Sequence, residues 1–374
     1  MAGRVEVGEL RACLPVRQVA SWRWRVASWG AFCLIGVMLL LLSGCFKWEY
    51  KWEALQSPTS NHLRGLYAVS EDVVWASGAN GTVIRTTNGG DSWEVLPVPG
   101  AEELDFRDIH ALDQYVAWVL SAGNGVSIYR TDNGGQNWHL QYHDPRPEAF
   151  YDGFDFTSDS TAMAYGDPID GQWSVLTTTN FGADWEGVNY AVLPPALEGE
   201  GGYAASGTGV VVRGQTAWLA TGGGEFARVL RTTDFGESWQ AFNTPLVSAP
   251  GAGIFSMAFS NDTDGIIVGG NYVDSASTNR ICAVTRNAGE TWTLVGDSAY
   301  PYGLGGYRSC VAVSDDGSFW LATGRNGWEW SRDHGWAWDA GGTEAYYSCA
   351  FAGDFVFASG RGGKLARMRW RPII

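Results

Sequence analysis

Short apolar runs separated by turn residues recur along this chain. Between residues 63 and 98 four such runs follow one another: LRGLYAV from Leu63, VVWASG from Val73, TVIRTT from Thr82 and WEVLPV from Trp93. Each run has the length of a strand and is rich in β-branched and aromatic residues, and Gly, Asn, Asp and Ser lie between the runs. This pattern is typical of strands joined by tight turns. It predicts four short antiparallel strands within this stretch.

An eight-residue box, Thr/Ser-x-Asp/Asn-x-Gly-x-x-Trp, recurs between the third and fourth runs. TTDFGESW from Thr232 to Trp239 is one example, and the six boxes begin at Thr86, Thr131, Thr178, Thr232, Thr285 and Ser331. The third side chain can accept hydrogen bonds from its own turn, Gly at the fifth position permits a positive φ, and the Trp anchors the following strand. We expect the boxes to be structural hairpin turns, with these third residues: Asn88, Asn133, Asn180, Asp234, Asn287 and Asp333.

A repeat of 45 to 54 residues that holds several short strands is typical of a β-propeller, in which one repeat forms one four-stranded blade. After the sixth box the chain has room for three strands, YYSCAFA from Tyr346, FVFASG from Phe355 and KLARMRW from Lys364. Near the other end, WEAL from Trp52 matches WEVL from Trp93. The sequence therefore predicts an all-β fold, a single seven-bladed propeller over residues 45–374 whose last blade is completed by an N-terminal strand.

The first 44 residues have the features of an export signal. Several arginines precede the uncharged run from Trp29 to Leu42, which is too short to span a bilayer comfortably and matches the apolar region of a secretory signal. The next residues, Leu42-Ser43-Gly44-Cys45, resemble the lipobox of bacterial lipoprotein signals. The resemblance implies cleavage before Cys45 and a lipid on its thiol. The alternative is a simple N-terminal anchor helix with an incidental cysteine.

The residue after Cys45 and the overall charge extend this expectation. Phe46 stands where an Asp would favour the inner membrane of a Gram-negative cell, so the lipoprotein rule favours the outer membrane. The chain has a formal net charge of −15, which argues against nucleic acid as a partner because phosphate binding needs clustered Lys and Arg. We expect a monomer on the periplasmic side of the envelope that contacts the membrane through its lipid.

Candidate binding residues lie at the start of the innermost strands and in the loops on the same face. Arg64, Arg107 and Arg308 occupy matching places in LRGL, FRDI and YRSC. Acidic residues lie near them by repeat position, and we include three in the candidate site: Asp152, Asp167 and Glu200. These charges predict a polar funnel at the channel mouth. The alternative is that each arginine pairs with a neighbouring carboxylate and holds the blades together.

Two cysteines occupy the same place in adjacent repeats. Cys310 in YRSC and Cys349 in YYSC are expected to face each other across a blade boundary. A disulfide needs Cα atoms within about 7 Å, and inner strands of neighbouring blades often lie farther apart. The sequence leaves the pairing open, and it predicts that Cys282 is buried and inert.

The boxes also occur in sialidase propellers, but the resemblance does not extend to the catalytic residues. That family has a Phe/Tyr-Arg-Ile-Pro segment near its start, and this chain has none. A glycosidase needs two carboxylates that flank the scissile bond, and spacing alone does not exclude one because Asp and Glu are plentiful in the loops. In a glycan hydrolase, the arginines would hold a carboxylate and Glu200 or Asp152 would act as acid or base. This enzyme remains the alternative function.

The chain more closely resembles propellers of the photosystem II stability/assembly factor type and their non-photosynthetic bacterial relatives. The similarity spans roughly residues 50 to 370. It lies in WASG-x-x-G-x-x-x-R-T-T-N-G-G-x-S-W from Trp75 to Trp93, the FRDI and YRSC segments, GEGGYAASGT from Gly199 and GIFSMAF from Gly253. The resemblance implies binding of a membrane-protein client without chemistry. The acidic charge and the lipobox depart from it and put a photosystem client in doubt.

Taken together, these features favour a non-catalytic binding or assembly scaffold for an envelope protein or complex. No nucleophile, metal-ligand or cofactor-binding pattern stands out, so we assign no catalytic residue, no metal and no cofactor.

Overall fold

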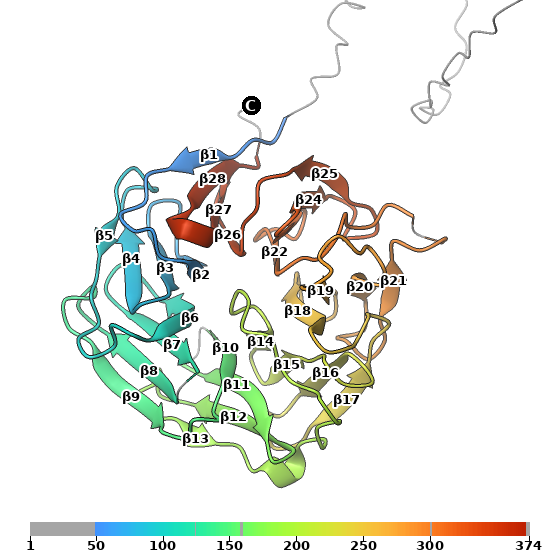
Figure 1. Cartoon of the computed structure of the whole chain (residues 1–374), viewed down its shortest axis with the longest axis horizontal. Helices are drawn as coiled ribbons and strands as arrows, with labels where there is room; N and C mark the ends of the chain where they lie inside the picture. The colour runs from blue at the N-terminus through green and yellow to red at the C-terminus, as the bar shows by residue number, and fades with distance from the viewer. Residues whose placement is uncertain (1–48, 124, 158–159, 300, 372–374) are drawn as a thin grey trace, which may run out of the picture. The chain divides into compact units, whose positions relative to one another are not determined.

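The computed structural model describes residues 49–371 except 124, 158, 159 and 300. These residues form one compact unit, a ring of seven four-stranded antiparallel sheets (Figure 1). The prediction of a seven-bladed all-β propeller is confirmed. The leader, the lipobox and Cys45 lie outside the described residues, so the predictions for residues 1–44 and for lipid attachment stay predictions.

The first four blades are built from consecutive strands. Blade 1 contains β2 (Leu63–Ala68), β3 (Val74–Gly78), β4 (Thr82–Thr86) and β5 (Glu94–Val95). Blade 2 contains β6 (Asp105–Ala111), β7 (Ala117–Ala122), β8 (Val126–Thr131) and β9 (His139–Asp144). Blade 3 contains β10 (Tyr151–Phe156), β11 (Ala162–Ile169), β12 (Gln172–Thr178) and β13 (Glu186–Gly187). Blade 4 contains β14 (Val210–Arg213), β15 (Thr216–Ala220), β16 (Arg228–Thr232) and β17 (Gln240–Asn243).

The remaining blades follow the same order until the chain ends. Blade 5 contains β18 (Ala252–Phe259), β19 (Gly265–Asn271), β20 (Cys282–Thr285) and β21 (Thr293–Val295). Blade 6 contains β22 (Cys310–Val313), β23 (Trp320–Gly324), β24 (Gly327–Ser331) and β25 (Asp339–Gly342). Blade 7 contains β26 (Ser348–Ala352), β27 (Phe355–Ser359), β28 (Leu365–Arg369) and β1 (Glu53–Leu55). Two short 3₁₀ turns lie in the described loops, η1 (Tyr190–Val192) and η2 (Arg361–Gly363).

The first strand of each blade lies innermost, and the first strands of neighbouring blades contact one another around the central channel (Figure 1). Because the strands alternate in direction, the loops that lead into each first strand lie on the same face as the loops between second and third strands. We call this the loop face. The six boxes join third to fourth strands and lie on the opposite face, which we call the box face.

Strand β1 closes the ring as the sequence predicted. It pairs antiparallel with β28, with Glu53 opposite Arg367, Ala54 opposite Ala366 and Leu55 opposite Leu365. The preceding Trp52 is 8% exposed and packs edge-on against Trp328 and at a tilt against Tyr346. This burial ties the N-terminal segment to blade 6 as well as to blade 7.

All six boxes have the same hydrogen-bonded turn. In the box from Thr232, the Thr232 hydroxyl accepts from the Gly236 N–H at 2.9 Å, and the Asp234 carboxylate accepts from the Ser238 N–H at 2.9 Å. Gly236 has a φ of 98°, as the sequence predicted for the fifth position. The fourth position is also left-handed, which the sequence did not predict: Phe235 has a φ of 54°. A residue with a Cβ is strained there by about 1 kcal/mol or more, so the surrounding hydrogen bonds hold the turn.

Hydrogen bonds between neighbouring first strands join the blades. The Asp108 carboxylate of β6 accepts from the Phe154 N–H of β10 at 2.9 Å. At the junction of the last and first blades, the Ser348 hydroxyl donates to the Arg64 carbonyl. These contacts leave the inner strands firmly positioned. Across residues 49–371, with the four gaps given above, no helix has the length and apolarity that crossing a bilayer requires.

Deletion of residues 49–56 should destabilise the propeller, because it exposes the edge of β28 and uncovers the apolar surface under Trp52. We expect a lower unfolding temperature and concentration-dependent aggregation, measured by circular dichroism and light scattering. Glu53→Gln is the matched control. It removes only an ion pair with Arg367 in which the Glu53 side chain is 61% exposed, and should cost less than about 1 kcal/mol. A deletion variant that unfolds like the parent would contradict the closure.

Candidate functional site

Four first strands carry a β-bulge near the loop face. In each of these strands, one residue has no partner in the second strand of the blade. The skipped residues are Arg64 in β2, Arg107 in β6, Asp152 in β10 and Phe255 in β18. A bulge re-aims the skipped side chain and interrupts the ladder. Three of the six candidate residues therefore occupy one structural position in successive blades. Arg308 lies just before β22, with its N–H bonded to the Gly269 carbonyl.

Arg107 and Arg64 differ in how their charges are compensated. Arg107 Nε donates to Asp105 at 2.6 Å, and its Nη1 donates to the Ala204 carbonyl at 2.9 Å. The Arg64 guanidinium lies 4.7 Å from the centre of the Tyr347 ring. Within the described chain, no carboxylate forms an ion pair with Arg64, and its buried Nε has no hydrogen-bond acceptor. Burial lowers the pKa of Arg64, and the nearby charge of Arg107 lowers it further.

Asp152 is a fully buried carboxyl group without a satisfied hydrogen bond. Its exposed fraction is 0%, and neither carboxyl oxygen has a well-aligned partner in the part of the chain that the structure describes. The Ala204 backbone approaches it too poorly to satisfy it, although this contact and Arg107 both act to lower its pKa. Burial and the neighbouring Asp167 outweigh them and raise the pKa of Asp152 well above its ordinary value.

Asp167 lines a shallow cavity of about 360 Å³ on the loop face. One of its oxygens accepts from the Gly202 N–H at 2.8 Å, and burial raises its pKa. Most of the cavity wall is main chain, because six of its residues are glycines: Gly199, Gly201, Gly202, Gly222, Gly223 and Gly251. The cavity therefore offers backbone groups and the Asp167 carboxylate to a partner, whereas the carboxylate of Glu200, which also lines it, is bound to Arg228.

Glu200 and Arg308 are each held in a buried ion pair. Glu200 accepts from Arg228 Nε at 2.8 Å and from the Thr221 hydroxyl at 2.6 Å, and Arg228 Nη2 also donates to it. Arg308 donates to Glu329 from Nε at 2.6 Å and from Nη2 at 2.5 Å. For Arg308, and for Arg107 beside Asp105, the structure matches the alternative in which each arginine pairs with a carboxylate. The partners Arg228 and Glu329 were not predicted; Glu329 is the only charged residue of its strand, whereas Arg228 begins a strand that also contains Arg231.

An aromatic cluster completes the rim of the channel. The Tyr203 and Phe255 rings stack with their centres 3.9 Å apart, and Tyr307 packs edge-on against Phe255 at 4.7 Å. The channel mouth on the loop face thus combines an arginine without an ion-pair partner in the described chain, a buried carboxyl group without a hydrogen bond and a largely buried aromatic cluster. We call these features together the channel mouth: Arg64, Arg107, Asp152, Tyr203, Phe255 and Tyr307.

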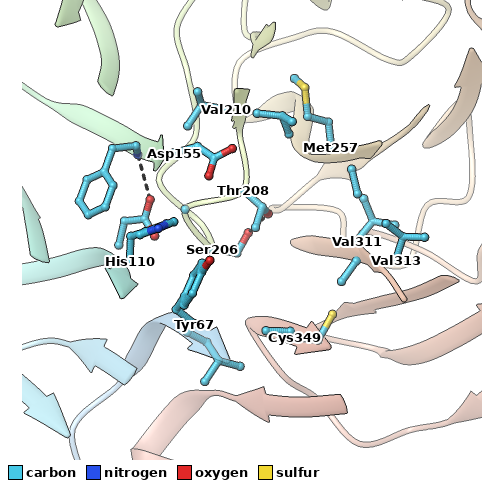
Figure 2. A pocket seen from close by; sticks show the side chains of 18 of the residues that line it. Tyr67, His110, Asp155, Ser206, Thr208, Val210, Met257, Val311, Val313 and Cys349 are labelled. Atoms are coloured by element: carbon cyan, nitrogen blue, oxygen red, sulfur yellow. Dashed lines mark hydrogen bonds between the residues drawn. The ribbon is translucent and has the colours of Figure 1, made fainter. Parts of the chain in front are cut away.

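The channel widens toward the box face into a cavity of about 420 Å³ (Figure 2). Tyr67, His110 and Asp155 lie on one side of it, and Met257 and Val311 lie on the other. Burial lowers the pKa of His110 to about 3 and raises that of Asp155 to about 7. Both oxygens of Asp155 accept backbone N–H bonds, so this carboxyl group ties blade 3 to blade 4. No pattern in the sequence predicts this cavity.

Three buried cysteines in the described chain are free thiols. Cys282 is buried, as predicted, and Cys310 and Cys349 are free thiols in neighbouring first strands. Among the described residues, no group of three or more His, Cys, Asp or Glu side chains is placed to hold a metal ion.

Comparison with known proteins gives the same architecture. The structure of YCF48 bound to a D1 peptide is 17% identical, covers 87% of this chain and 99% of its own, and has a TM-score of 0.62. YCF48 from Cyanidioschyzon merolae is 17% identical over 85% of this chain and 98% of its own, with a TM-score of 0.58. A virginiamycin B lyase from Staphylococcus aureus is 12% identical over 86% of this chain and 100% of its own, with a TM-score of 0.62. At these identities the similarity shows the fold alone.

The sequence itself decides the family. No curated protein sequence matches the chain. The family model of the photosynthesis system II assembly factor YCF48, however, matches residues 34–293, which is more than half of the chain. This match confirms the resemblance noted from the boxes and the FRDI segment, and the protein therefore belongs to the YCF48 assembly factor family of β-propellers.

Proposed function

We propose that this protein is a non-catalytic scaffold that binds a segment of a client protein at its channel mouth. The observation that carries the proposal is the pair of unsatisfied buried groups there: Arg64 Nε and both carboxyl oxygens of Asp152 have no hydrogen-bond partner in the described chain. A buried polar group without a partner costs about 1–3 kcal/mol. Asp152 is 0% exposed, whereas the Arg64 guanidinium is only partly buried and has no ion-pair partner among the described residues, so a polar ligand can supply that partner and regain part of this free energy.

The composition of the channel mouth suits a polypeptide ligand. Arg64 and Arg107 can bind a carboxylate or backbone carbonyls, and the partly buried Tyr203 ring, which stacks on the buried Phe255, lies in the same channel mouth. Tyrosine and arginine are the side chains that most often dominate protein interfaces. A YCF48 structure contains a D1 peptide, which supports a protein segment as the class of ligand. The client that we propose is an envelope protein or complex.

The location that we propose follows from the leader sequence. Cleavage before Cys45 and acylation of its thiol would anchor the protein on the periplasmic side of the envelope, in the outer membrane. Acyl chains contribute about 0.8 kcal/mol per buried CH₂, so two or three of them give a stable anchor. The four residues Cys45 to Trp48 would link the lipid to the described propeller.

A glycan hydrolase that uses Glu200 is less compatible with the geometry. Both Glu200 oxygens bind Arg228, and the Leu197 N–H and the Thr221 hydroxyl add further hydrogen bonds. A general acid or base must be free to exchange a proton with the substrate. Glu200 is instead positioned to hold the loop that ends at Gly202 against blade 4.

Charge reversal at the channel mouth should weaken client binding. A pull-down from detergent-solubilised envelope recovers the client, and calorimetry with that client measures its affinity. We expect Arg64→Glu and Arg107→Glu each to weaken binding by about 10-fold to 100-fold, because a charged hydrogen bond contributes about 1.5–3 kcal/mol. Arg213→Glu is the matched control. Arg213 lies at the opposite end of an inner strand, in an ion pair with an exposed Asp262. Equal binding by the parent and both mouth variants, with all folds intact, would reject the scaffold proposal.

Substitution of Glu200 should reduce stability. Glu200→Gln leaves Arg228 buried without its counter-charge, and loss of one partner of a buried ion pair costs about 3–5 kcal/mol. Denaturant unfolding measures this loss, and Glu198→Gln, at an exposed position two residues away, should change stability by less than about 0.5 kcal/mol. If Glu200→Gln kept full stability but eliminated hydrolysis of a glycan by the parent protein, the enzyme would be the better interpretation.

Lipid attachment can be tested separately from client binding. Cells that express the chain are grown with a clickable fatty acid, and we expect label on the parent and none on Cys45→Ala, because acylation requires that thiol. The parent should fractionate with the outer membrane and the variant should not. Cys282→Ser is the control for loss of a cysteine elsewhere. Label on Cys45→Ala at the parental level would show that Cys45 is not the anchor.

A further inference from the structure

Two thiols meet at the boundary between blades 6 and 7. Cys310 begins β22 and Cys349 is the second residue of β26, and these two first strands pack side by side. Their Sγ atoms are 3.7 Å apart, and the Cys349 N–H donates to Cys310 Sγ at 3.4 Å. Both side chains are buried, with exposed fractions of 0% and 3%. The backbone therefore already places the two sulfur atoms in contact.

We propose that Cys310 and Cys349 are a redox pair that forms a reversible disulfide between blades 6 and 7. A disulfide bond is about 2.05 Å long, so the sulfur atoms must approach by less than about 2 Å. Rotation of the two side chains can supply most of this movement. The inner strands of neighbouring blades, often too far apart for a disulfide, are close enough at this boundary.

The environment makes Cys310 the nucleophile. The hydrogen bond from Cys349 lowers the pKa of the Cys310 thiol to about 7 despite burial, and the Thr208 hydroxyl donates to the same sulfur at 3.8 Å. Burial raises the pKa of Cys349 well above its ordinary value, so this thiol keeps its proton and donates. Cys282 is the internal contrast, because burial raises the pKa of its thiol to about 12 and no other described thiol contacts it.

The pair borders the channel at Cys349, and Cys310 lies behind it with an exposed fraction of 0%. Cys349 lines the cavity of about 420 Å³ on the box-face side, and so does Thr208, which contacts Cys310 (Figure 2). The oxidant in the proposed reaction is a small organic disulfide. Side-chain rotation exposes the Cys310 thiolate to the reagent, and the thiolate attacks one of the reagent's sulfur atoms and expels a thiolate. Cys349 then loses its proton and attacks the Cys310 sulfur of the mixed disulfide, which expels the second thiolate. The protein loses two electrons and two protons, and the reagent becomes two thiols.

The bond would strengthen the ring at its closing blade. Blade 7 contains both ends of the described chain, and its outermost strand, β1, pairs with β28 through only three residues. A disulfide between β22 and β26 adds a covalent connection that does not depend on β1. The oxidised protein should therefore unfold at a higher temperature than the reduced protein, and the difference should be larger when β1 is weakened.

The test uses the full chain, with hydroxyethyl disulfide as the oxidant and dithiothreitol as the reductant. After alkylation and proteolysis, mass spectrometry should find the Cys310 and Cys349 peptides linked, with Cys282 unmodified until the protein unfolds. Oxidation should raise the unfolding temperature by about 5 °C, and dithiothreitol should reverse this shift. The rate should rise about tenfold between pH 6 and pH 8, because the reactive thiolate forms as the pH passes about 7.

Two variants separate the pair from other effects. Cys349→Ser should stop at a mixed disulfide on Cys310 and lose the temperature shift, whereas Cys282→Ser should behave like the parent. If either variant fails to fold, the linked peptides, the temperature shift and the pH dependence of the parent still decide. The proposal is overturned if excess hydroxyethyl disulfide leaves both thiols free in the folded parent, or if it yields only mixed disulfides.

Discussion

Closure of the ring holds the seven blades of this propeller together. Six blades form from consecutive strands, but the seventh needs β1 from the N-terminal end of the described chain to cover β28. Without that strand, a row of unpaired backbone groups would lie at the edge of blade 7. The ladder between β1 and β28 is short and is by itself a weak connection. The burial of Trp52 against Trp328 and Tyr346 adds stability that this short ladder lacks. A closed ring is also what brings strands of distant repeats together around one channel.

Crowding at the axis explains where the polar site lies. A Cβ on Gly65 would overlap the Ser77 hydroxyl and touch the backbone of Asp108 in the next blade, so the inner strand needs glycine there. The bulge that skips Arg64 falls directly before this glycine, and the bulge at Asp152 falls directly before Gly153. The bulge and the glycine that follows it thus have two effects: the inner strands pack closely, and the bulge residues lie at the channel mouth.

The repeats made the fold predictable from sequence, because each box carries its own hydrogen bonds within eight residues. The structure reproduces this pattern from Thr86 to Ser331, and it adds the left-handed fourth position, where two boxes have glycine (Gly89 and Gly134) but the box of Phe235 does not. The site was less predictable because it depends on contacts between repeats. The sequence placed Arg64 and Arg107 at matching positions, and the bulges agree. It could not show that Glu200 is neutralised by Arg228, 28 residues away, since that pair depends on how a loop folds back onto blade 4.

The distribution of compensated and uncompensated charge separates structure from binding at the channel mouth. Arg228 neutralises Glu200 and Glu329 neutralises Arg308, so neither buried charge needs a ligand as its partner. Arg64 instead rests on the face of Tyr347, a contact that contributes about 0.5–1 kcal/mol at an exposed site and more when desolvated. Such a contact holds the guanidinium in place but leaves its hydrogen-bonding edge free. An arginine that is positioned without being satisfied loses little conformational entropy when it binds, which favours recognition of a polar ligand at this position.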